Sequence, residues 1–155
     1  MIQESLPLCR DAEFRRFQQE NRATVGEVVQ AIKRGIAAKE VEHLSSLLGL
    51  PLLELSIALG VPPTTIRRKA RGGRVLRLDQ GERVMGLQRI VGQVQTMVED
   101  CGDPTNFDAG AWTGVWLKRA VPALGGKRPI EFLNTVAGLQ LLSDLLQRNV
   151  TGAYA

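Results

Sequence analysis

The 155-residue sequence contains few of the residues from which metal and catalytic sites are commonly built. It has a single histidine, His43, and two cysteines, Cys9 and Cys101, which lie far apart and form no Cys-x-x-Cys motif. Zinc sites and nucleophile–base pairs both depend on clusters of such side chains, and the sequence offers none. We therefore expect no metal, no cofactor and no enzymatic activity, with both cysteines present as free thiols in a reducing compartment.

Long apolar segments are also absent. The longest apolar stretch, around residues 47–53, is far shorter than the roughly 18 residues that a membrane-spanning helix needs. The N-terminus carries Glu4, Arg10, Asp11 and Glu13 and has no apolar signal core. These two absences indicate no contact with a membrane and favour a cytoplasmic protein.

Positive charge is concentrated in the middle of the chain. Residues 61–89 carry eight basic and two acidic side chains, a net charge of +6, whereas the whole chain has a net charge of +4. Residues 1–60 carry seven basic and eight acidic side chains, and residues 100–155 carry five of each. A basic segment between neutral flanks is typical of a nucleic-acid-binding surface, while a merely solvated face more often mixes the two signs.

Hydrophobic spacing predicts helices along most of the sequence. Residues 1–22, with Phe14 and Phe17 at helical spacing, could form a short helix or a loosely docked arm. Thr24 and Glu27 make a capping-box pattern, and apolar residues then recur at helical spacing until Gly35: Val25, Val28, Val29 and Ile32. Further helices are expected at 39–48, 52–59, 63–70, 78–99, 107–117, from 129 and at 135–148. No useful strand-like alternation occurs, so we predict an all-α fold.

Two of these helices, 52–59 and 63–70, are predicted to form a helix-turn-helix. Gly60 can adopt the left-handed conformation that a short interhelical turn needs, and Ile66 would point inward. The second helix of such a motif lies in the major groove of DNA, where threonine and arginine can contact base edges. Base contacts are expected from Thr64, Thr65 and Arg68. Phosphate contacts are expected from Arg67, Lys69, Arg71 and Arg74.

The last third of the chain contains several short motifs in a distinctive order. The pair Trp116-Leu117 precedes a segment that runs from Ala123 through Gly125-Gly126-Lys127-Arg128 to Leu133. The two glycines permit backbone angles closed to other residues, but the segment lacks the spacing of a Walker phosphate loop. Trp112 lies four residues before Trp116 on the same helix face, which is typical of core packing, although one of the two could serve an interface. The remaining motif residues are Thr135, Gly138, Arg148, Gly152 and Tyr154.

These C-terminal motifs closely resemble the C-terminal domain of the Xre/MbcA/ParS antitoxin family. Further matches to the Xre-like half of that family are found upstream, at 44–49, 59–61, 65–69 and 82–83, so the resemblance covers about residues 40–155. The sequence departs from the family pattern at Gly81, where serine is common next to an acidic residue, and at Glu131, where aspartate is common.

The resemblance implies an antitoxin of a type II toxin–antitoxin system, with a helix-turn-helix DNA-binding half followed by a small helical toxin-binding domain. Its partner would be a RES-domain toxin, an enzyme that acts on NAD, and the C-terminal domain and tail would cover the toxin's active site. The expected toxin contacts are Trp116, Lys127, Arg128, Arg148, Gly152 and Tyr154. The chain would also repress its own operon as a homodimer within a larger toxin–antitoxin complex.

We expect three segments: residues 1–23, an Xre-like helix-turn-helix region at 24–91 and a toxin-binding domain at 92–155. The alternative function is a stand-alone transcriptional regulator whose C-terminal third serves dimerisation or effector binding. Basic charge alone supports both alternatives equally, because it predicts only the DNA-binding half.

Overall fold

A computed structural model describes residues 5–150, with the side chains of residues 10–149. Within this part the chain folds into α-helices and two short 3-10 helices, and its one β-type contact is an isolated bridge between Ala37 and Val75. The all-α prediction is confirmed.

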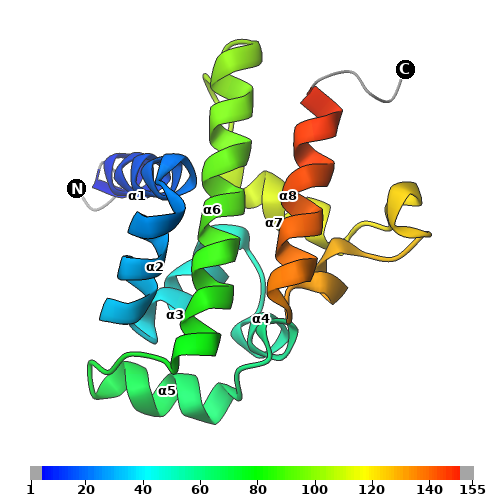
Figure 1. The fold of residues 1–155 in the computed structure, drawn as a ribbon. Helices are drawn as coiled ribbons and strands as arrows, with labels where there is room; N and C mark the ends of the chain where they lie inside the picture. Colours follow the sequence, from blue (N-terminus) through cyan, green and yellow to red (C-terminus); the bar gives the residue numbers. More distant parts are fainter. Residues whose placement is uncertain (1–4, 151–155) are drawn as a thin grey trace.

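The helices lie close to the predicted positions. Five precede the long central helix: α1 (Ser5–Arg22), α2 (Val25–Arg34), α3 (Lys39–Leu48), α4 (Leu52–Leu59) and α5 (Pro63–Arg71). The others are α6 (Leu78–Cys101), α7 (Ala109–Lys118), η1 (Pro122–Leu124), η2 (Pro129–Phe132) and α8 (Val136–Val150). Figure 1 shows α6 at the centre, with α1 and α2 on one side and α8 running parallel to it on the other. The helix α5 lies across the end of the molecule where α6 begins.

The ends of the helices follow the local signals in the sequence. Glu27 N donates to Thr24 Oγ1 over 3.3 Å and Thr24 N donates to Glu27 Oε2 over 2.8 Å, which confirms the predicted capping box. Gly49 ends α3 in the left-handed conformation with φ 67°. Pro51 lies directly before the first residue of α4. The helix from Pro129 is the short 3-10 helix η2, and just before α8 the Thr135 hydroxyl accepts a hydrogen bond from Gly138 N over 2.9 Å.

The N-terminal residues form a docked helix rather than a loose arm. Phe14 and Phe17 of α1 are 6% and 1% exposed and belong to the main core. Gly92 of α6 faces them: a Cβ added there would lie 2.1 Å from the carbonyl oxygen of Phe17. The two backbones therefore almost touch, and only glycine permits this approach.

The helices α3 and α4 each bury a leucine face in this core. Leu44 and Leu47 of α3 and Leu55 and Leu59 of α4 are at most 5% exposed. Between residues 5 and 150 no single helix is long and apolar enough to cross a membrane. Only α3 and α4 taken together reach the required length and composition, and the chain bends by 117° between them.

Candidate functional site

The helices α4 and α5 form the helix-turn-helix expected from the sequence. Gly60 joins them in the left-handed conformation, with φ 70° and ψ 30°. The next residue, Val61, is 1% exposed, and Ile66 of α5 is fully buried, so both fasten the motif to the core. Pro63 opens α5 at its first position, where a missing N–H costs no hydrogen bond.

One arginine of the basic segment, Arg83, forms hydrogen bonds with the turn of this motif. Arg83 of α6 donates from Nε to the carbonyl oxygen of Leu59 over 2.7 Å and from Nη2 to that of Gly60 over 3.4 Å. These carbonyls lie at the end of α4, where the helix itself supplies no donors. The guanidinium therefore fixes the turn that orients α5. The sequence shows Arg83 as a basic residue but gives no sign of this contact, which joins positions 24 residues apart.

Asp79, one of the two acidic residues in the basic segment, forms its ion pairs with arginines outside α5. Asp79 accepts from Arg77 at 3.1 and 2.9 Å and lies 3.5 Å from Arg83 Nη1. The hydrogen bonds from Arg77, followed by the charges of Arg77 and Arg83, lower the pKa of Asp79 to about 2. Asp79 is therefore occupied by two arginines that lie outside α5.

The basic residues predicted to contact DNA lie together on α5 and just after it. Arg67, Arg68, Arg71 and Arg74 are exposed and Lys69 is half-buried. None of these five residues forms an ion pair with any residue in the part of the chain that the structure describes. Five cations without ion pairs among the described residues thus lie on or just after one short helix and form a local positive surface.

The N-terminal turn of α5 carries the two threonines. Thr64 is exposed and Thr65 is half-buried, and both lie beside the inward-facing Ile66. The first turn of a recognition helix is the part that most often reaches base edges. Figure 1 shows that nothing covers the outer side of α5 at its end of the molecule. A backbone clamp fixes the segment behind it, since Ala38 N donates to Arg74 O over 3.0 Å and Leu76 N to Ile36 O over 2.8 Å.

The C-terminal third packs onto the helix-turn-helix half through α7. A Cβ added to Gly114 would lie 1.9 Å from the carbonyl oxygen of Leu48, so α7 rests directly on the backbone of α3. Lys118 Nζ lies 2.6 Å from Glu54 Oε1 of α4. An open groove of about 600 Å³ lies along this seam, with Val115 at its edge 60% exposed.

The two tryptophans of α7 occupy different environments. Their rings stack with centroids 6.0 Å apart and an interplanar angle of 13°. Trp116, predicted at the toxin interface, is 9% exposed and belongs to the core, whereas Trp112 is 41% exposed. The spacing of the pair left core packing and interface open; the structure places Trp116 in the core and leaves Trp112 partly exposed.

The loop after α7 presents the two basic residues predicted there. Gly125 and Gly126 have φ values of 67° and 79°, which confirms the prediction of special backbone angles. Lys127 and Arg128 are exposed, and Arg128 N donates to Glu131 Oε2 over 2.8 Å. Figure 1 shows this loop projecting from the side of the body, away from α2.

The helix α8, which carries Arg148, runs toward the end of the molecule opposite α5 (Figure 1). It is fixed to α6 by a polar pair: Gln93 Nε2 donates to Ser143 O over 3.0 Å, and Ser143 Oγ donates to Gln93 Oε1 over 2.8 Å. Arg148 is exposed in its last turn. Gly152 and Tyr154 lie outside the described residues. The four predicted contacts within the described residues come from three elements: Trp116 from α7, Lys127 and Arg128 from the following loop, and Arg148 from α8.

A partly buried charge network between α1, α3 and α6 was not predicted from the sequence. Arg16 donates to both oxygens of Glu40, at 3.0 and 2.8 Å, and Gln88 Nε2 donates to Glu40 over 2.7 Å. Burial opposes the charge of Glu40, but Arg16 outweighs it, so the pKa of Glu40 is lowered. Nearby Glu20 has no such partner: Oε2 is buried without a hydrogen bond, and burial raises its pKa to about 7. Helical spacing alone does not show which charges burial will affect.

Metal-binding groups do not gather within residues 5–150: no cluster of three or more histidine, cysteine or acidic side chains could hold an ion there. His43 is exposed on α3. Cys101 is an exposed free thiol, as predicted, and the side chain of Cys9 lies outside the described part.

Comparison with known proteins agrees with both halves of this description. Residues 27–89 match the antitoxin Xre-like helix-turn-helix domain, and residues 105–149 match the antitoxin Xre/MbcA/ParS C-terminal toxin-binding domain. A protein of Sphingobium sp. (strain YBL2), named "Prs ADP-ribosylating antitoxin", is 35% identical over 134 residues, which cover 86% of this chain and 84% of that protein. The first domain implies DNA and the second a protein toxin as partners. The chain therefore belongs to the Xre/MbcA/ParS family of antitoxins.

Proposed function

We propose that this antitoxin neutralises a RES-domain toxin that consumes NAD and represses the operon that encodes both proteins. The observation that carries the proposal is the separation of two surfaces: the cationic α5 lies at one end of α6, while the matched toxin-binding region lies along α7, the following loop and α8. The chain can therefore hold DNA and toxin at the same time. It acts by binding, without catalysis of its own.

The relative's name supports an NAD-using toxin. The Sphingobium protein is named for ADP-ribosylation of Prs, and ADP-ribosyl transfer takes its ADP-ribose group from NAD. Breaking the glycosidic bond to nicotinamide creates an oxocarbenium-like state, which enzymes commonly stabilise with carboxylates. Arginine pairs with carboxylates in a two-point geometry. We propose that Arg148 and the following Gly152 and Tyr154 enter such a cleft and block it.

The loop and α7 form the supporting part of the proposed toxin interface. Lys127 and Arg128 project on a loop whose two glycines have fixed positive φ values. Trp116 contributes indirectly, because its buried ring supports the stacked, 41% exposed ring of Trp112. Exposed aromatic anchors that rest on a rigid base are typical of the residues that dominate protein interfaces.

The proposed repressor activity rests on α5. Thr64, Thr65 and Arg68 read bases, and Arg67, Lys69, Arg71 and Arg74 hold phosphates. A homodimer doubles this contact because two recognition helices meet two half-sites about one helical turn apart. Since operator DNA is the proposed partner, we place the protein in the cytoplasm.

Co-expression with the product of the adjacent reading frame tests the toxin half. We expect the full chain to relieve growth arrest, to restore cellular NAD and to co-purify with that product. Removal of residues 151–155 is expected to abolish rescue while α8 remains folded by circular dichroism. Rescue that survives this deletion contradicts the tail mechanism. Salt-dependent DNA binding without any rescue identifies the chain as a stand-alone regulator instead.

A further inference from the structure

Three basic residues outside α5 lie close to the segment that follows it. Lys33 and Arg34 end α2 and Lys39 begins α3, and all three side chains are exposed. None of them forms an ion pair with a residue in the part of the chain that the structure describes. In the sequence they lie within residues 1–60, which carry seven basic and eight acidic side chains, so charge counting did not link them to α5.

Backbone hydrogen bonds place these residues beside the end of the α5 surface. They join residues 36–38, between α2 and α3, to residues 74–76, between α5 and α6. The isolated β-bridge lies at the centre of this pairing. Lys39 directly follows the first paired segment and Arg34 precedes it by two positions, while Arg74 belongs to the second paired segment. The basic residues of α2 and α3 are therefore fixed next to those that follow α5.

A glycine makes this close pairing possible. Gly35 has φ 103°, and a Cβ added to it would lie 2.9 Å from Cγ1 of Val75. A larger residue at this position would strain the backbone and push the two connecting segments apart. The end of α2 can therefore approach the segment after α5 because residue 35 has no side chain.

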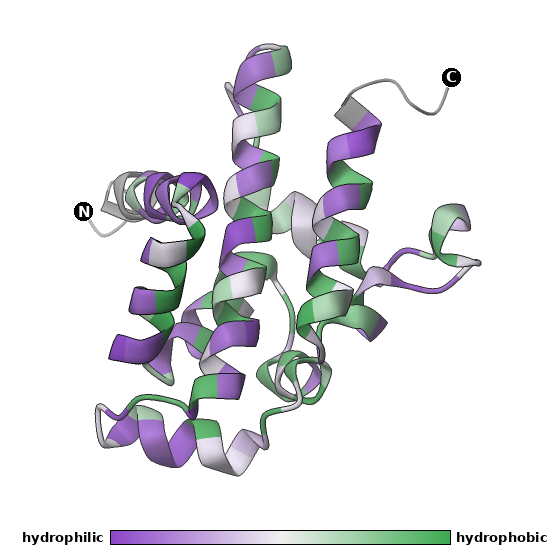
Figure 2. Cartoon of the chain, in the orientation of Figure 1, coloured by the Kyte–Doolittle hydropathy of each residue, from purple (hydrophilic) through white to green (hydrophobic). Residues whose placement is uncertain are grey.

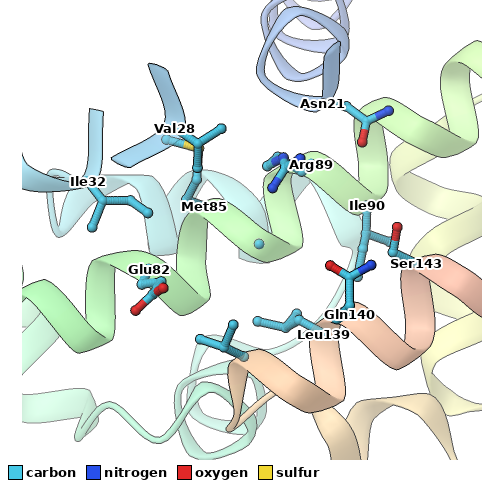
Figure 3. Close-up of a pocket in the computed structure, with 12 residues that line it drawn as sticks. Asn21, Val28, Ile32, Glu82, Met85, Arg89, Ile90, Leu139, Gln140 and Ser143 are labelled. Atoms are coloured by element: carbon cyan, nitrogen blue, oxygen red, sulfur yellow. The ribbon is translucent and has the colours of Figure 1, made fainter. Parts of the chain in front are cut away.

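The acidic side chains of these helices form no ion pair with the three cations in the described part of the chain. On α2, Glu27 belongs to the capping box at the opposite end of the helix. On α3, Glu40 is paired with α1, and Glu42 is half-buried. On α6, Asp79 binds two arginines outside α5, and Figure 3 shows Glu82 at the cavity of about 160 Å³ between α2, α6 and α8.

We propose that Lys33, Arg34 and Lys39 bind the phosphate backbone of duplex DNA beside the groove that α5 enters. They extend the five cations of residues 67–74 to a surface of eight basic side chains. Figure 2 shows hydrophilic residues at the end of α2 and along α5. Phosphate strands border the major groove on both sides, so a basic surface next to the recognition helix meets one of them. The inference rests on the proposed function at one point, the binding of DNA by α5.

Contacts of this kind fix the orientation of a protein on the duplex but read no bases. The three residues should therefore add to the affinity for every duplex and leave the preference for the operator unchanged. This separates them from Thr64, Thr65 and Arg68, which are proposed to read bases.

The triple substitution K33Q/R34Q/K39Q tests the proposal, because glutamine removes the charge and still suits a helix. Fluorescence anisotropy compares a duplex from upstream of the antitoxin's reading frame with a scrambled duplex of equal length. We expect the slope of log affinity against log salt to fall by about 2–3 for both duplexes, and the affinity at about 50 mM salt to fall at least tenfold. The ratio of the two affinities should change by less than about twofold. Each single substitution should lower the slope by about 1.

Two further variants serve as controls. R15Q/R22Q/R119Q removes three exposed charges from α1 and the end of α7, and its slope should equal that of the wild type. K33R/R34K/K39R keeps all three charges and should also bind as the wild type does. If it binds as weakly as the glutamine variant while circular dichroism shows the same helicity, the residues act through packing and the inference is wrong.

The remaining outcomes separate this inference from the proposed function. A wild-type chain that shows no salt-dependent binding to either duplex overturns the repressor activity and this surface together. Wild-type binding with an unchanged slope in K33Q/R34Q/K39Q overturns the surface alone. A selective loss of binding to the upstream duplex would mean that these residues affect base reading, which also contradicts a phosphate contact.

Discussion

The two ends of this antitoxin present different kinds of surface. At one end, five cations that pair with no acidic side chain in the described part of the chain lie within eight consecutive residues, 67–74, on and after a single short helix. Toward the other end, the candidate toxin contacts come from α7, the loop at 121–128 and the last turn of α8, and they mix aromatic and basic side chains. The first surface suits a regular polyanion, and the second suits a partner of defined shape. Binding at the first should depend strongly on salt, and binding at the second on packing.

The largest expected effect comes from disrupting the packing of α7, which belongs to the toxin-binding region, against α3. G114V places side-chain atoms where the carbonyl oxygen of Leu48 lies, 1.9 Å from an added Cβ. We expect a loss of about 3 kcal/mol or more in the free energy of unfolding, measured by urea titration followed by circular dichroism. G26A is the matched control because its Cβ meets only Thr24 Oγ1 at 4.0 Å. Equal stability of G114V and wild type would mean that α7 does not rest on α3.

The second effect removes the DNA-binding surface and spares the other. R67A/R68A/K69A should weaken operator binding by at least about 100-fold and reduce the slope of log affinity against log salt by about 2–3. Fluorescence anisotropy at several salt concentrations measures both quantities. R15A/R22A, on α1, removes charge elsewhere and should leave the slope unchanged. Toxin rescue should persist in the triple variant, and its loss would show that the two surfaces are not independent.

A smaller effect distinguishes the tryptophans. W112A removes an exposed ring and should weaken toxin binding about tenfold with little change in Tm. W116A removes the buried ring beneath it and should cost about 3 kcal/mol of stability, in addition to any binding loss. Calorimetric titration and thermal unfolding of both variants separate the two roles. A reversed pattern would place the toxin contact on the buried ring.

The smallest expected effect is a dependence of stability on pH, which comes from Glu20 on α1, between the two ends. Burial raises the pKa of Glu20 to about 7, above its ordinary value of 4.5, so the folded chain holds a proton that the unfolded chain releases between these values. The free energy of unfolding therefore decreases as the pH rises from about 4.5 to about 7. E20Q mimics the protonated form and should raise Tm by about 2 °C at pH 8 and leave it unchanged at pH 4. A gain of equal size at both pH values would exclude titration of Glu20 as its cause.

Local features of the chain could be predicted from sequence because their causes are local. The capping box at Thr24, the left-handed Gly60 and the inward Ile66 depend on residues a few positions apart. The basic character of α5 is likewise a property of consecutive residues. The boundaries of α3 agree with those predicted, since a glycine follows its last apolar position directly.

Features that depend on distant partners could not be predicted in this way. Gly92 and Gly114 are ordinary residues in the sequence, and their importance comes from a backbone that crosses them. Arg83 was counted with the DNA-binding charge, although it holds the turn after α4. In the C-terminal third, hydrophobic periodicity predicted helices but no function, and only the resemblance to a family identified this part as toxin-binding.

The helix α6 supports both ends of the molecule through direct hydrogen bonds. Near its start Arg83 fastens the turn before α5, and further along Gln93 holds α8, so one rod about 36 Å long, at 1.5 Å per residue, carries both attachments. The predicted boundary at residue 91 falls within this rod. Related antitoxins could therefore exchange toxin specificity by a crossover after α6, in the 102–108 segment, which keeps Arg83 with the turn that it supports, provided that the incoming α8 also supplies a partner for Gln93. A crossover between α5 and α6 would import a foreign arginine brace, and the hybrid would have to evolve that contact anew.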